Sequence, residues 1–297
     1  MLDDGLARRF RAALMRWYHA EGRHALPWRL TCDPYAVLIS EVMLQQTQVD
    51  RVLPYYEAWL ARWPGFNALS EASPAEVIEQ WAGLGYNRRA LALHRLAVSV
   101  THDYGGELPR DEAALRALPG IGPYTASAVR SFAFEERTSV IDTNIGRVLG
   151  RVFSGTATMA EAGQTAVAGA AESLLPRRNA REHNLALMDL GAMVCRARGP
   201  VCEACPLVAM CAWHARGRPE AERPPHTTER FEDSARFARG RIVDALRRVP
   251  VLSDAELVAI LPGRHSERVH IYLRALERDG MVEHTGAGWR LPATGGR

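Results

Sequence analysis

Apolar side chains recur three and four residues apart through the first 217 residues, which is the spacing of amphipathic helices. The segments with this spacing are 6–18, 35–48, 53–62, 74–82, 88–103 and 112–118. Ser73-Pro74 is a typical helix start, and Gly83 and Gly105-Gly106 are typical stops. No convincing alternation of apolar and polar residues occurs before residue 250. The pattern predicts an all-α region.

The last part of the chain has a different pattern. Pro and charged residues dominate between 216 and 232, which predicts an exposed linker. Three predicted helices follow, at 234–248, 253–261 and 266–279, and two short apolar runs after Gly280 indicate a β-hairpin. This is the order of a winged helix, a common nucleic-acid-binding module. An appendage that stabilises the fold or binds a partner remains the alternative.

Composition indicates an ordinary globular protein. The chain has 297 residues, of which 47% are hydrophobic and 24% are charged, so it can bury a substantial core. The N-terminus MLDDGLARRF is charged and lacks the apolar segment of a signal peptide. No apolar run is long enough to span a bilayer. We therefore expect a cytoplasmic protein without membrane contact.

The kind of basic residue is more informative than the net charge, which is only +3. All 37 Lys+Arg positions are arginine, and no lysine occurs. Covalent catalysis through a Schiff base needs an amine. Since no side chain supplies one, only the α-amino group of Met1 could form such a bond.

Four of the five cysteines are clustered near the end of the helical region. They follow the pattern Cys195-x6-Cys202-x2-Cys205-x5-Cys211, and thiolates so spaced can hold one tetrahedral zinc ion or a four-iron cubane. Without a secretory signal, a disulfide framework is not expected. A zinc ribbon usually presents two C-x2-C pairs, whereas one is present here. Cys32 stands alone and is expected to have no ligand role.

Glycines mark two loops that could bind DNA phosphates. The first, LPGIGPYTA at 118–126, joins two predicted helices, and Gly120 and Gly122 permit tight backbone geometry there. Backbone N–H groups at the start of the following helix can bind a phosphate without reading a base. The second loop, GLGY at 83–86, also has two glycines two positions apart, but it matches such a phosphate-binding turn less closely. Purely structural turns remain the alternative for both loops.

Two carboxylates have settings that suit cleavage of a glycosidic bond. Glu41 lies in a helix that is apolar on both sides, where burial would raise its pKa and keep a proton available. Asp142 follows an apolar pair and precedes a basic helix, a position that also suits an N-cap. An acid and a carboxylate on opposite sides of one bond are the pair that sugar hydrolases use. The polar run 45–48 follows on the same predicted helix as Glu41, where it could fill the space of an extruded base.

Residues 24–214 resemble the catalytic core of the MutY-type adenine DNA glycosylases, within the endonuclease III or helix–hairpin–helix superfamily. The shared strings are LPWR, PYAVLISEVMLQQTQV, GLGY, LPGIGPYTA, the V-x-D-x-N box and MDLGAMVC ahead of the cysteines. The resemblance implies a monofunctional DNA glycosylase of base excision repair. Its partner would be double-stranded DNA of the bacterial nucleoid, from which it would release adenine mispaired with guanine or 8-oxoguanine.

This resemblance also implies an architecture. We expect an all-α helix–hairpin–helix core of two lobes at 1–217, a linker at 218–233 and a winged-helix-like α+β domain at 234–297. The cofactor implied is a [4Fe–4S] cluster in the loop 195–211, with Cys195, Cys202, Cys205 and Cys211 as ligands. The protein is expected to act as a monomer.

Individual residues take roles from the same resemblance. Glu41 would protonate the leaving adenine, Asp142 would stabilise the sugar cation, and Asn144 would orient it. Tyr124 occupies the place of the catalytic lysine of lyase-competent relatives, so little or no β-elimination is expected. Gln46 would wedge into the duplex. The other residues expected at the base or the DNA are Trp28, Arg29, Leu44, Gln45, Thr47, Gly85, Tyr86, Gly120, Gly122 and Thr125.

The sequence departs from the family pattern in three places. Thr143 stands where most members have glycine, and Leu185 stands where a polar residue usually contacts the base edge. The part after the linker is too short for the usual NUDIX-like domain that recognises 8-oxoguanine. Three alternatives therefore stay open: a glycosylase for thymine or uracil opposite guanine, a glycosylase for a deaminated purine such as hypoxanthine, and a non-catalytic DNA-damage-binding protein.

Overall fold

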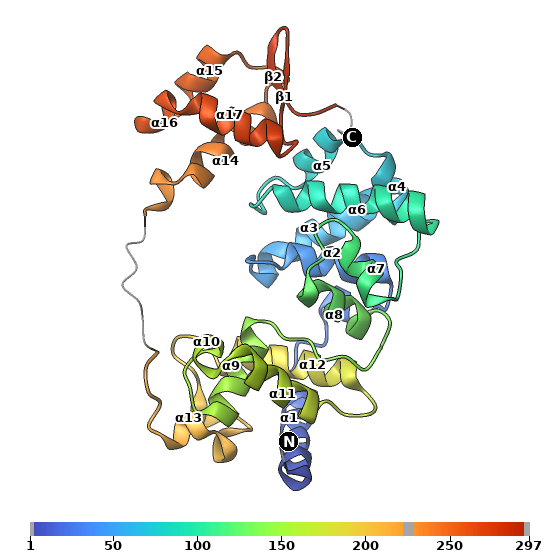
Figure 1. Ribbon diagram of the computed structural model, residues 1–297, viewed down its shortest axis with the longest axis vertical. Coiled ribbons are helices and arrows are strands. Elements are labelled where there is room, and N and C mark those ends of the chain that lie inside the picture. The colour runs from blue at the N-terminus through green and yellow to red at the C-terminus, as the bar shows by residue number, and fades with distance from the viewer. Residues whose placement is uncertain (1–2, 222–228, 294–297) are drawn as a thin grey trace. The chain divides into compact units, whose positions relative to one another are not determined.

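The computed structural model describes residues 3–221 and 229–293, and the chain divides into two compact units (Figure 1). Unit 1 comprises 1–38, 110–116 and 121–225, and unit 2 comprises 39–109, 117–120 and 226–297. Both units are helical, which confirms the predicted fold class. Of the expected linker at 218–233, residues 222–228 lie outside the described residues. None of the helices in the described ranges combines the length and apolarity that a membrane span requires.

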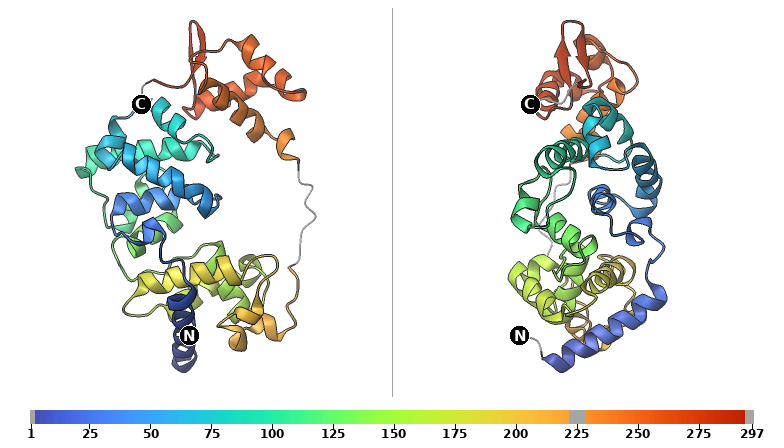
Figure 2. Two further views of the ribbon diagram at one scale, coloured as in Figure 1. Left: turned by 180° about the vertical axis from the view of Figure 1, so that it is seen from behind. Right: turned by 90° about the vertical axis from the view of Figure 1, so that its right-hand side faces the viewer.

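Unit 1 is built on the long N-terminal helix α1 (Asp4–Glu21), which begins where the Asp3 carboxylate accepts a hydrogen bond from the Leu6 N–H at 2.8 Å. The buried face of α1, with Phe10 and Leu14, packs against α11 and α12 (Figures 1 and 2). The other elements of unit 1 are η1 (Pro27–Arg29), α8 (Pro123–Phe132), α9 (Thr143–Leu149), α10 (Met159–Ala162), α11 (Gln164–Leu174), α12 (Ala180–Asp189), η4 (Cys202–Ala204), η5 (Val208–Met210) and α13 (Ala212–Ala215).

Two helices of unit 1 end in a π-helical turn, and the second of these turns leads to the cysteine-rich loop. Helix α9 continues into η2 (Gly150–Ser154), and α12 continues into η3 (Leu190–Val194). A Cβ atom at Gly191 would lie 2.6 Å from Cβ of Asn144, so η3 and α9 touch without room for a side chain. This close approach fixes the start of α9, which carries Asp142 and Asn144, against the segment that leads to Cys195.

Unit 2 has a core of aromatic side chains around α3 (Val49–Arg62). Trp59 is fully buried and meets Trp63 and Trp81 edge to face, with ring centroids 4.8 and 5.4 Å apart. Helix α4 (Phe66–Glu71) packs along α6 (Arg88–Tyr104). Helix α5 (Pro74–Gln80) begins at the expected Ser73-Pro74 start, where the structure shows a capping box of Ser73 and Glu76. Helices α2 (Pro34–Met43) and α7 (Glu112–Ala117) have residues in both units.

The C-terminal part of unit 2 has the predicted order of helices followed by a hairpin. Its elements are η6 (Phe231–Asp233), α14 (Ala235–Leu246), α15 (Asp254–Ala259), α16 (Arg264–Glu267), α17 (Val269–Arg278), β1 (Glu283–Thr285) and β2 (Gly288–Arg290). The strands are antiparallel, with Glu283 opposite Arg290. The single helix expected at 266–279 is two helices, because the chain leaves helical geometry at Arg268.

The C-terminal elements share one hydrophobic core with α5 and α6. Ile78 and Leu91 of those helices pack in the same cluster as the buried side chains of α14, α17 and the hairpin. The Ala75 N–H donates to the Pro292 carbonyl at 3.1 Å, and the Arg247 guanidinium donates to the Ile78 carbonyl at 2.8 Å. The C-terminal part is therefore fixed on this face of unit 2 by both apolar contacts and hydrogen bonds (Figure 2).

Candidate active site and thiol cavity

The hairpin between α7 and α8 has the backbone geometry expected of a phosphate-binding turn. Gly120 has φ +81°, and a Cβ atom there would lie 2.9 Å from Cβ of Ala92, so only glycine fits without movement. Gly122 precedes α8, and no side chain caps the first turn of that helix. The N–H groups at the start of α8 point out of the helix at its positive end. Of the other residues expected here, Thr125 is buried and Tyr124 is half-buried on α8.

Asp142 is the N-cap of α9 and sits in a hydrogen-bonded recess of unit 1. Its carboxylate accepts from the Ile145 N–H at 2.7 Å and from the Asn144 amide at 2.9 Å. Burial raises the pKa of Asp142 above its ordinary value, and these hydrogen bonds together with the charge of Arg147 oppose that rise. The two residues predicted to act on the sugar, Asp142 and Asn144, are therefore in direct contact.

Arg147 ties this recess to the segment before the cysteines. Its guanidinium donates to the Asn144 side-chain oxygen at 2.8 Å, to the Gly191 carbonyl at 2.6 Å and to the Cys195 carbonyl at 2.7 Å. Asn144 is thereby held in the one amide orientation that lets it donate to Asp142. The position of the Asp142 carboxylate depends on the backbone around Cys195 through this chain of contacts.

Asn184, on α12, was not singled out by the sequence, yet it supports the same recess. It is 2% exposed, accepts from the Val140 N–H, and donates to the Ser131 hydroxyl and the Thr138 carbonyl at 2.9 Å each. A buried amide with its partners satisfied holds a backbone segment in one position. The signal available in the sequence was a polar residue at the start of the largely apolar stretch NLALMDL.

The Arg29 side chain, expected at the base pocket, is engaged in a buried ion pair. Its two terminal nitrogens donate to the Asp189 carboxylate at 2.6 and 2.8 Å, and Arg23 donates to the same group at 2.7 Å. The Asp189 side chain is 0% exposed, and these partners hold its pKa below the ordinary value although burial raises it. Trp28 lies beside Arg29 in η1 and is buried. A role for either residue at the base stays a prediction.

The prediction that residues 45–48 continue the helix of Glu41 is wrong. Helix α2 ends at Met43, and residues 44–46 form a turn in which Gln46 has φ +56°. Glu41 lies in the last turns of α2 and is 6% exposed. Gln46 is exposed on the turn, whereas Leu44, Gln45 and Thr47 are half-buried.

The Arg89 side chain accounts for the end of helix α2 at Met43. Its guanidinium donates to the carbonyls of Val42, Met43 and Gln45, at distances of 2.7 to 3.1 Å, and so takes up the carbonyls at the helix end. It also donates to the carbonyls of Leu84 and Gly85. Burial lowers the pKa of Arg89 to about 10. One side chain thus joins the Gln46 turn to the loop of Gly85 and Tyr86.

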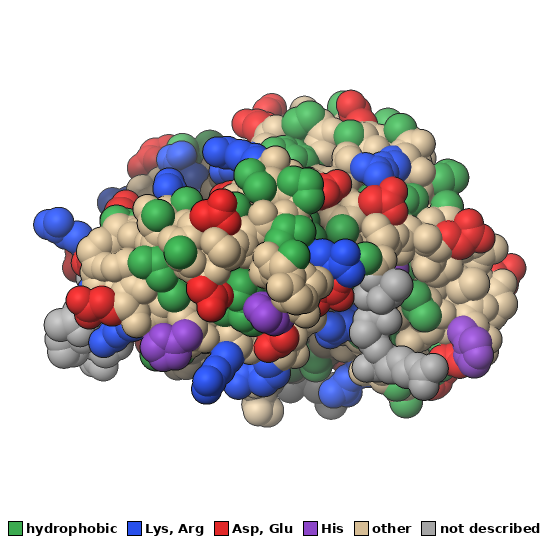
Figure 3. Space-filling view, turned by 90° about the horizontal axis from the view of Figure 1, so that it is seen from above, with side chains coloured by type: hydrophobic (Ala, Val, Ile, Leu, Met, Phe, Trp, Pro, Cys, Tyr) green, Lys and Arg blue, Asp and Glu red, His purple; other side chains and the backbone are tan. Residues whose placement is uncertain are grey.

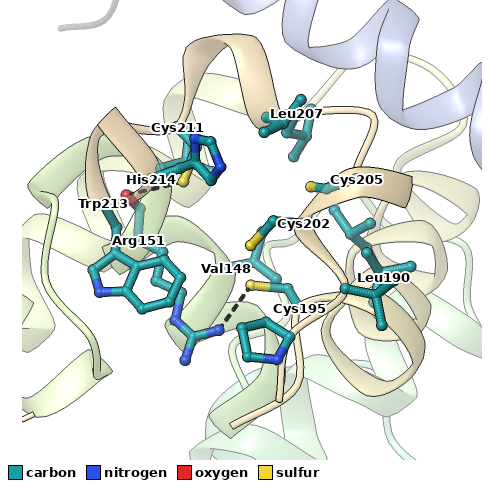
Figure 4. Close-up of a pocket in the computed structure, with 15 residues that line it drawn as sticks. Val148, Arg151, Leu190, Cys195, Cys202, Cys205, Leu207, Cys211, Trp213 and His214 are labelled. Carbon is teal, nitrogen blue, oxygen red and sulfur yellow. Dashed lines mark hydrogen bonds between the residues drawn. The ribbon is translucent and has the colours of Figure 1, made fainter. Parts of the chain in front are cut away.

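All four clustered cysteines line one pocket of unit 1 (Figure 4). Cys202 is buried, and the other three are half-buried. Burial raises the pKa of the Cys205 thiol to about 11, and the charges of the other three cysteines raise it as well, because all four lie close together. Among the described residues, no three His, Cys, Asp or Glu side chains surround a position for a single metal ion. Cys32 is exposed and lies outside the pocket.

A buried arginine without a carboxylate lies against these thiols. Arg151 is 3% exposed, and its guanidinium donates to the Cys195 sulfur at 3.4 Å and to the Arg196 carbonyl at 2.9 Å. It also lies 4.3 Å from the centroid of the Trp213 ring (Figure 4). Within the described ranges no carboxylate pairs with Arg151. The pocket thus combines four thiols with a cation that lacks an anionic partner.

The fold and the hairpin define a helix–hairpin–helix base excision repair protein, since residues 39–170 match the HhH-GPD superfamily base excision DNA repair proteins. The chain is 42% identical to an adenine DNA glycosylase of Mycolicibacterium smegmatis over 93% of each chain. The chain belongs to the MutY-type adenine DNA glycosylase family. It is also 33% identical to a thymine/uracil-DNA glycosylase of Methanothermobacter thermautotrophicus, over 72% of this chain and 98% of that one. A solved thermostable thymine-DNA glycosylase superposes with a TM-score of 0.65 at 32% identity, covering 71% of this chain and 97% of the other.

Proposed function

We propose that this protein is a DNA glycosylase that hydrolyses the N-glycosidic bond of adenine mispaired with guanine or 8-oxoguanine in double-stranded DNA. The observation that carries this proposal is the 42% identity to an adenine DNA glycosylase along nearly the whole of both chains. A likeness of that extent includes the C-terminal part of the chain as well as the residues of the candidate site.

The chemistry assigns different tasks to Glu41 and Asp142. Adenine is a poor leaving group until its ring is protonated, and Glu41, buried in an apolar helix, is suited to carry that proton. Loss of the base leaves positive charge on the sugar, which a carboxylate held in a water-poor recess stabilises more strongly than one in solvent. Asp142 is such a carboxylate, and its contacts with Ile145 and Asn144 fix it in place.

We propose that excision is not followed by β-elimination. Tyr124 stands at the position of the lyase lysine, and the sequence contains no lysine that could form a Schiff base with the abasic sugar. Borohydride added during turnover traps such an intermediate as a covalent protein–DNA adduct. No adduct is expected here, and a trapped adduct that survives replacement of the N-terminal amine by an acetyl group would contradict the proposal.

We propose that the thiol pocket holds a [4Fe–4S] cluster on Cys195, Cys202, Cys205 and Cys211. A single zinc ion needs its four sulfurs at about 2.3 Å, crowded around one point. The four cysteines line one pocket but include only one C-x2-C pair, which favours a cubane, in which each cysteine binds a different iron atom. With four thiolate ligands the cluster brings negative charge, which would neutralise the buried Arg151. When bound, it would supply a structural crosslink between η3 and α13.

A second substrate class is favoured by one specific observation. The solved thymine-DNA glycosylase and the archaeal thymine/uracil-DNA glycosylase are 32% and 33% identical to this chain over about seven-tenths of its length. Leu185, buried on α12, is an apolar residue where a polar base contact was expected. Excision of thymine or uracil opposite guanine is therefore the alternative.

The test presents the protein with duplexes that each hold one mispair, and cleaves the resulting abasic sites with alkali. Breaks at adenine opposite guanine and opposite 8-oxoguanine, but not in the A·T control, are the expected result. Breaks only at thymine or uracil opposite guanine would replace the proposal by its alternative. Glu41→Gln is expected to abolish the breaks while duplex affinity is kept, and Glu57→Gln, at an exposed position of α3, serves as the matched control.

A further inference from the structure

Buried polar side chains are more informative in this protein than surface charge. Among the described side chains that Figure 3 draws, acidic and basic groups are interspersed, so charge alone does not mark a binding surface on that face. Helix α12, in contrast, carries Arg181, Asn184 and Asp189 among buried apolar side chains such as Leu185 and Leu187. Each of the three polar residues binds a segment that comes from elsewhere in unit 1.

Arg181, in the first turn of α12, joins the η1 turn to the end of α8. Its Nη2 donates to the carbonyls of Arg29 and Thr31, at 2.8 and 3.0 Å, and its Nε donates to the Phe132 carbonyl at 3.0 Å. Phe132 is the last residue of α8, so its carbonyl has no partner within that helix. Arg181 therefore fixes the main chain directly after Trp28.

The other end of α12 holds the same turn by a side chain. Asp189, the last residue of α12, accepts two hydrogen bonds from the Arg29 guanidinium, and it accepts two more from the main-chain N–H and the guanidinium of Arg23. The start of α12 thus binds the main chain of η1, and its end binds the Arg29 side chain. Trp28, which is buried between these attachments along the chain, has little freedom to move.

Asn184 lies one turn after Arg181, on the same side of α12. Its amide donates to the Thr138 carbonyl at 2.9 Å and accepts from the Val140 N–H at 3.3 Å, so it binds the main chain on both sides of one residue. Asp142 follows Val140 by two positions. The Asn184 amide therefore sets where the chain enters the recess of the Asp142 carboxylate.

Both attachments bear on catalysis, because cleavage of a glycosidic bond involves two parts of one nucleotide. The base has to be held while a carboxylate lies beside the sugar, and a displacement of about 1 Å can slow a reaction about 100-fold. One rigid helix sets the distance between the segment that Arg181 holds and the segment that Asn184 holds. Loosening either attachment should therefore disturb one part of the nucleotide more than the other.

We propose that α12 positions the two halves of the site, with Arg181 acting on the base through η1 and Asn184 acting on the sugar through the segment before Asp142. The inference rests on the proposed function, since it takes Trp28 and Asp142 as the residues next to the base and the sugar. Arg181 and Asn184 are positioning residues, which act through the groups that they hold. Loss of Arg181 weakens capture of the base, and loss of Asn184 slows the chemical step.

The experiment measures single-turnover release of adenine from an A·G duplex by the full-length protein at a series of enzyme concentrations. It yields a maximum rate and a half-saturating concentration, and the amplitude corrects for inactive protein. Asn184→Ala is expected to lower the maximum rate about 30-fold and to leave the half-saturating concentration within about twofold. Arg181→Ala is expected to raise the half-saturating concentration about tenfold and to keep the maximum rate within about threefold, because the pocket has to be ordered upon binding.

Two variants separate the bridging role of Arg181 from its charge. Arg178→Ala removes an exposed charge three positions earlier, and we expect parent values for it. Arg181→Lys keeps the charge but lacks the planar fork that reaches three carbonyls, so its half-saturating concentration should also rise. Full parent affinity of Arg181→Lys would overturn the inference, because Arg181 would then act by attracting the charge of DNA.

Two further variants apply the same comparison to Asn184. Asn184→Asp keeps the oxygen that accepts from Val140 and should be faster than Asn184→Ala. Ser131→Ala removes the one partner of Asn184 that lies outside the segment before Asp142, and it should lower the maximum rate about threefold or less. If Asn184→Ala does not unfold cooperatively in urea, Asn184→Asp takes its place beside Ser131→Ala, and it should then be the slower of the two.

Two results would overturn the inference. One is a proportional change of both kinetic parameters in Asn184→Ala and Arg181→Ala, which a general loss of structure would produce. The other is a parent-like maximum rate of Asn184→Ala. Failure of the parent to release adenine would instead contradict the proposed function, and the variants would then be compared on the base that the parent does release.

Discussion

Two buried arginine sites in unit 1 differ in what neutralises them. The Arg29 side chain is 6% exposed and pairs with the fully buried Asp189, which also binds Arg23. Arg151 is 3% exposed and meets carbonyl oxygens, a tryptophan ring and a thiol, but no carboxylate among the described residues. Burying an uncompensated charge is unfavourable by several kcal/mol. The first site is therefore neutralised by a carboxylate of the chain, whereas the second is neutralised only when the neighbouring cysteines become thiolates, as they do when they hold a cluster.

The largest effect is expected from removing the Asp189 carboxylate that neutralises Arg29 and Arg23. Asp189→Asn leaves two guanidinium groups without their carboxylate and should lower the free energy of unfolding by about 3–5 kcal/mol. Urea unfolding followed by circular dichroism measures this loss. Glu182→Gln removes a carboxylate from an exposed pair with His19 and is expected to change stability by about 1 kcal/mol or less. If both substitutions had the same small effect, the Asp189 site would not be the stabilising element that its geometry indicates.

The second prediction concerns the loss of the cluster that would neutralise Arg151. Cys205→Ser should lose iron and visible absorbance, and its unfolding free energy should fall by about 3 kcal/mol because Arg151 is left uncompensated. Iron analysis and thermal unfolding in parallel make the measurement. Cys32→Ser, at the exposed cysteine outside the pocket, should keep full iron content and stability. Zinc in place of iron in the purified protein would contradict the proposed cofactor.

A third prediction concerns the buried imidazole of His183. Both ring nitrogens of His183 are buried without hydrogen bonds among the described residues, and burial lowers its pKa to about 4. The unfolded chain therefore takes up a proton near pH 6.5 that the folded chain refuses until about pH 4, so stability falls as the pH drops through this window. The loss approaches about 3 kcal/mol for a shift of this size.

His183→Leu should remove that pH dependence between pH 6.5 and 4, while substitution of the exposed His270 by Gln should leave it unchanged. Midpoints of urea unfolding at a series of pH values give the answer. An unchanged slope in His183→Leu would show that another group controls the acid sensitivity.

The smallest effect is expected when Arg151 itself is replaced in a protein that has lost its cluster. In the Cys205→Ser background, Arg151→Met replaces the uncompensated cation by an apolar side chain of similar length and should recover about 1–2 kcal/mol. In the parent with its cluster the same substitution should be destabilising. A double-mutant cycle of unfolding free energies measures the difference, and additivity of the two substitutions would contradict the coupling.

The features that sequence predicted well are those with a local signal. Helical spacing, the helix start at Ser73-Pro74, the tight turn at Gly120 and the cysteine pattern all depend on residues close together in the chain. The end of α2 at Met43 was mispredicted, because it depends on Arg89, which captures carbonyls more than forty positions earlier. Residues 44–48 contain no glycine or proline, so nothing local marked the end of the helix.

The same limit explains which site residues were missed. Asp189 and its arginines are about 160 positions apart in sequence, and the three partners of Asn184 come from other elements. No motif or period links such residues, so their pairing could not be read from the chain. The sequence singled out Asp142 and Asn144 by their motif, but the role of Arg147 in holding Asn144 is visible only in three dimensions.

The central claim is that this chain releases adenine by acid-assisted hydrolysis. Chromatography of the free bases from a single-turnover reaction on an A·G duplex tests it most directly. We expect one adenine per active enzyme, an intact strand until alkali is added, and a rate reduced by about 10²–10⁴ in Glu41→Gln. Release of thymine from a T·G duplex with no adenine from A·G, or adenine release by Glu41→Gln at the parent's rate, would contradict the claim.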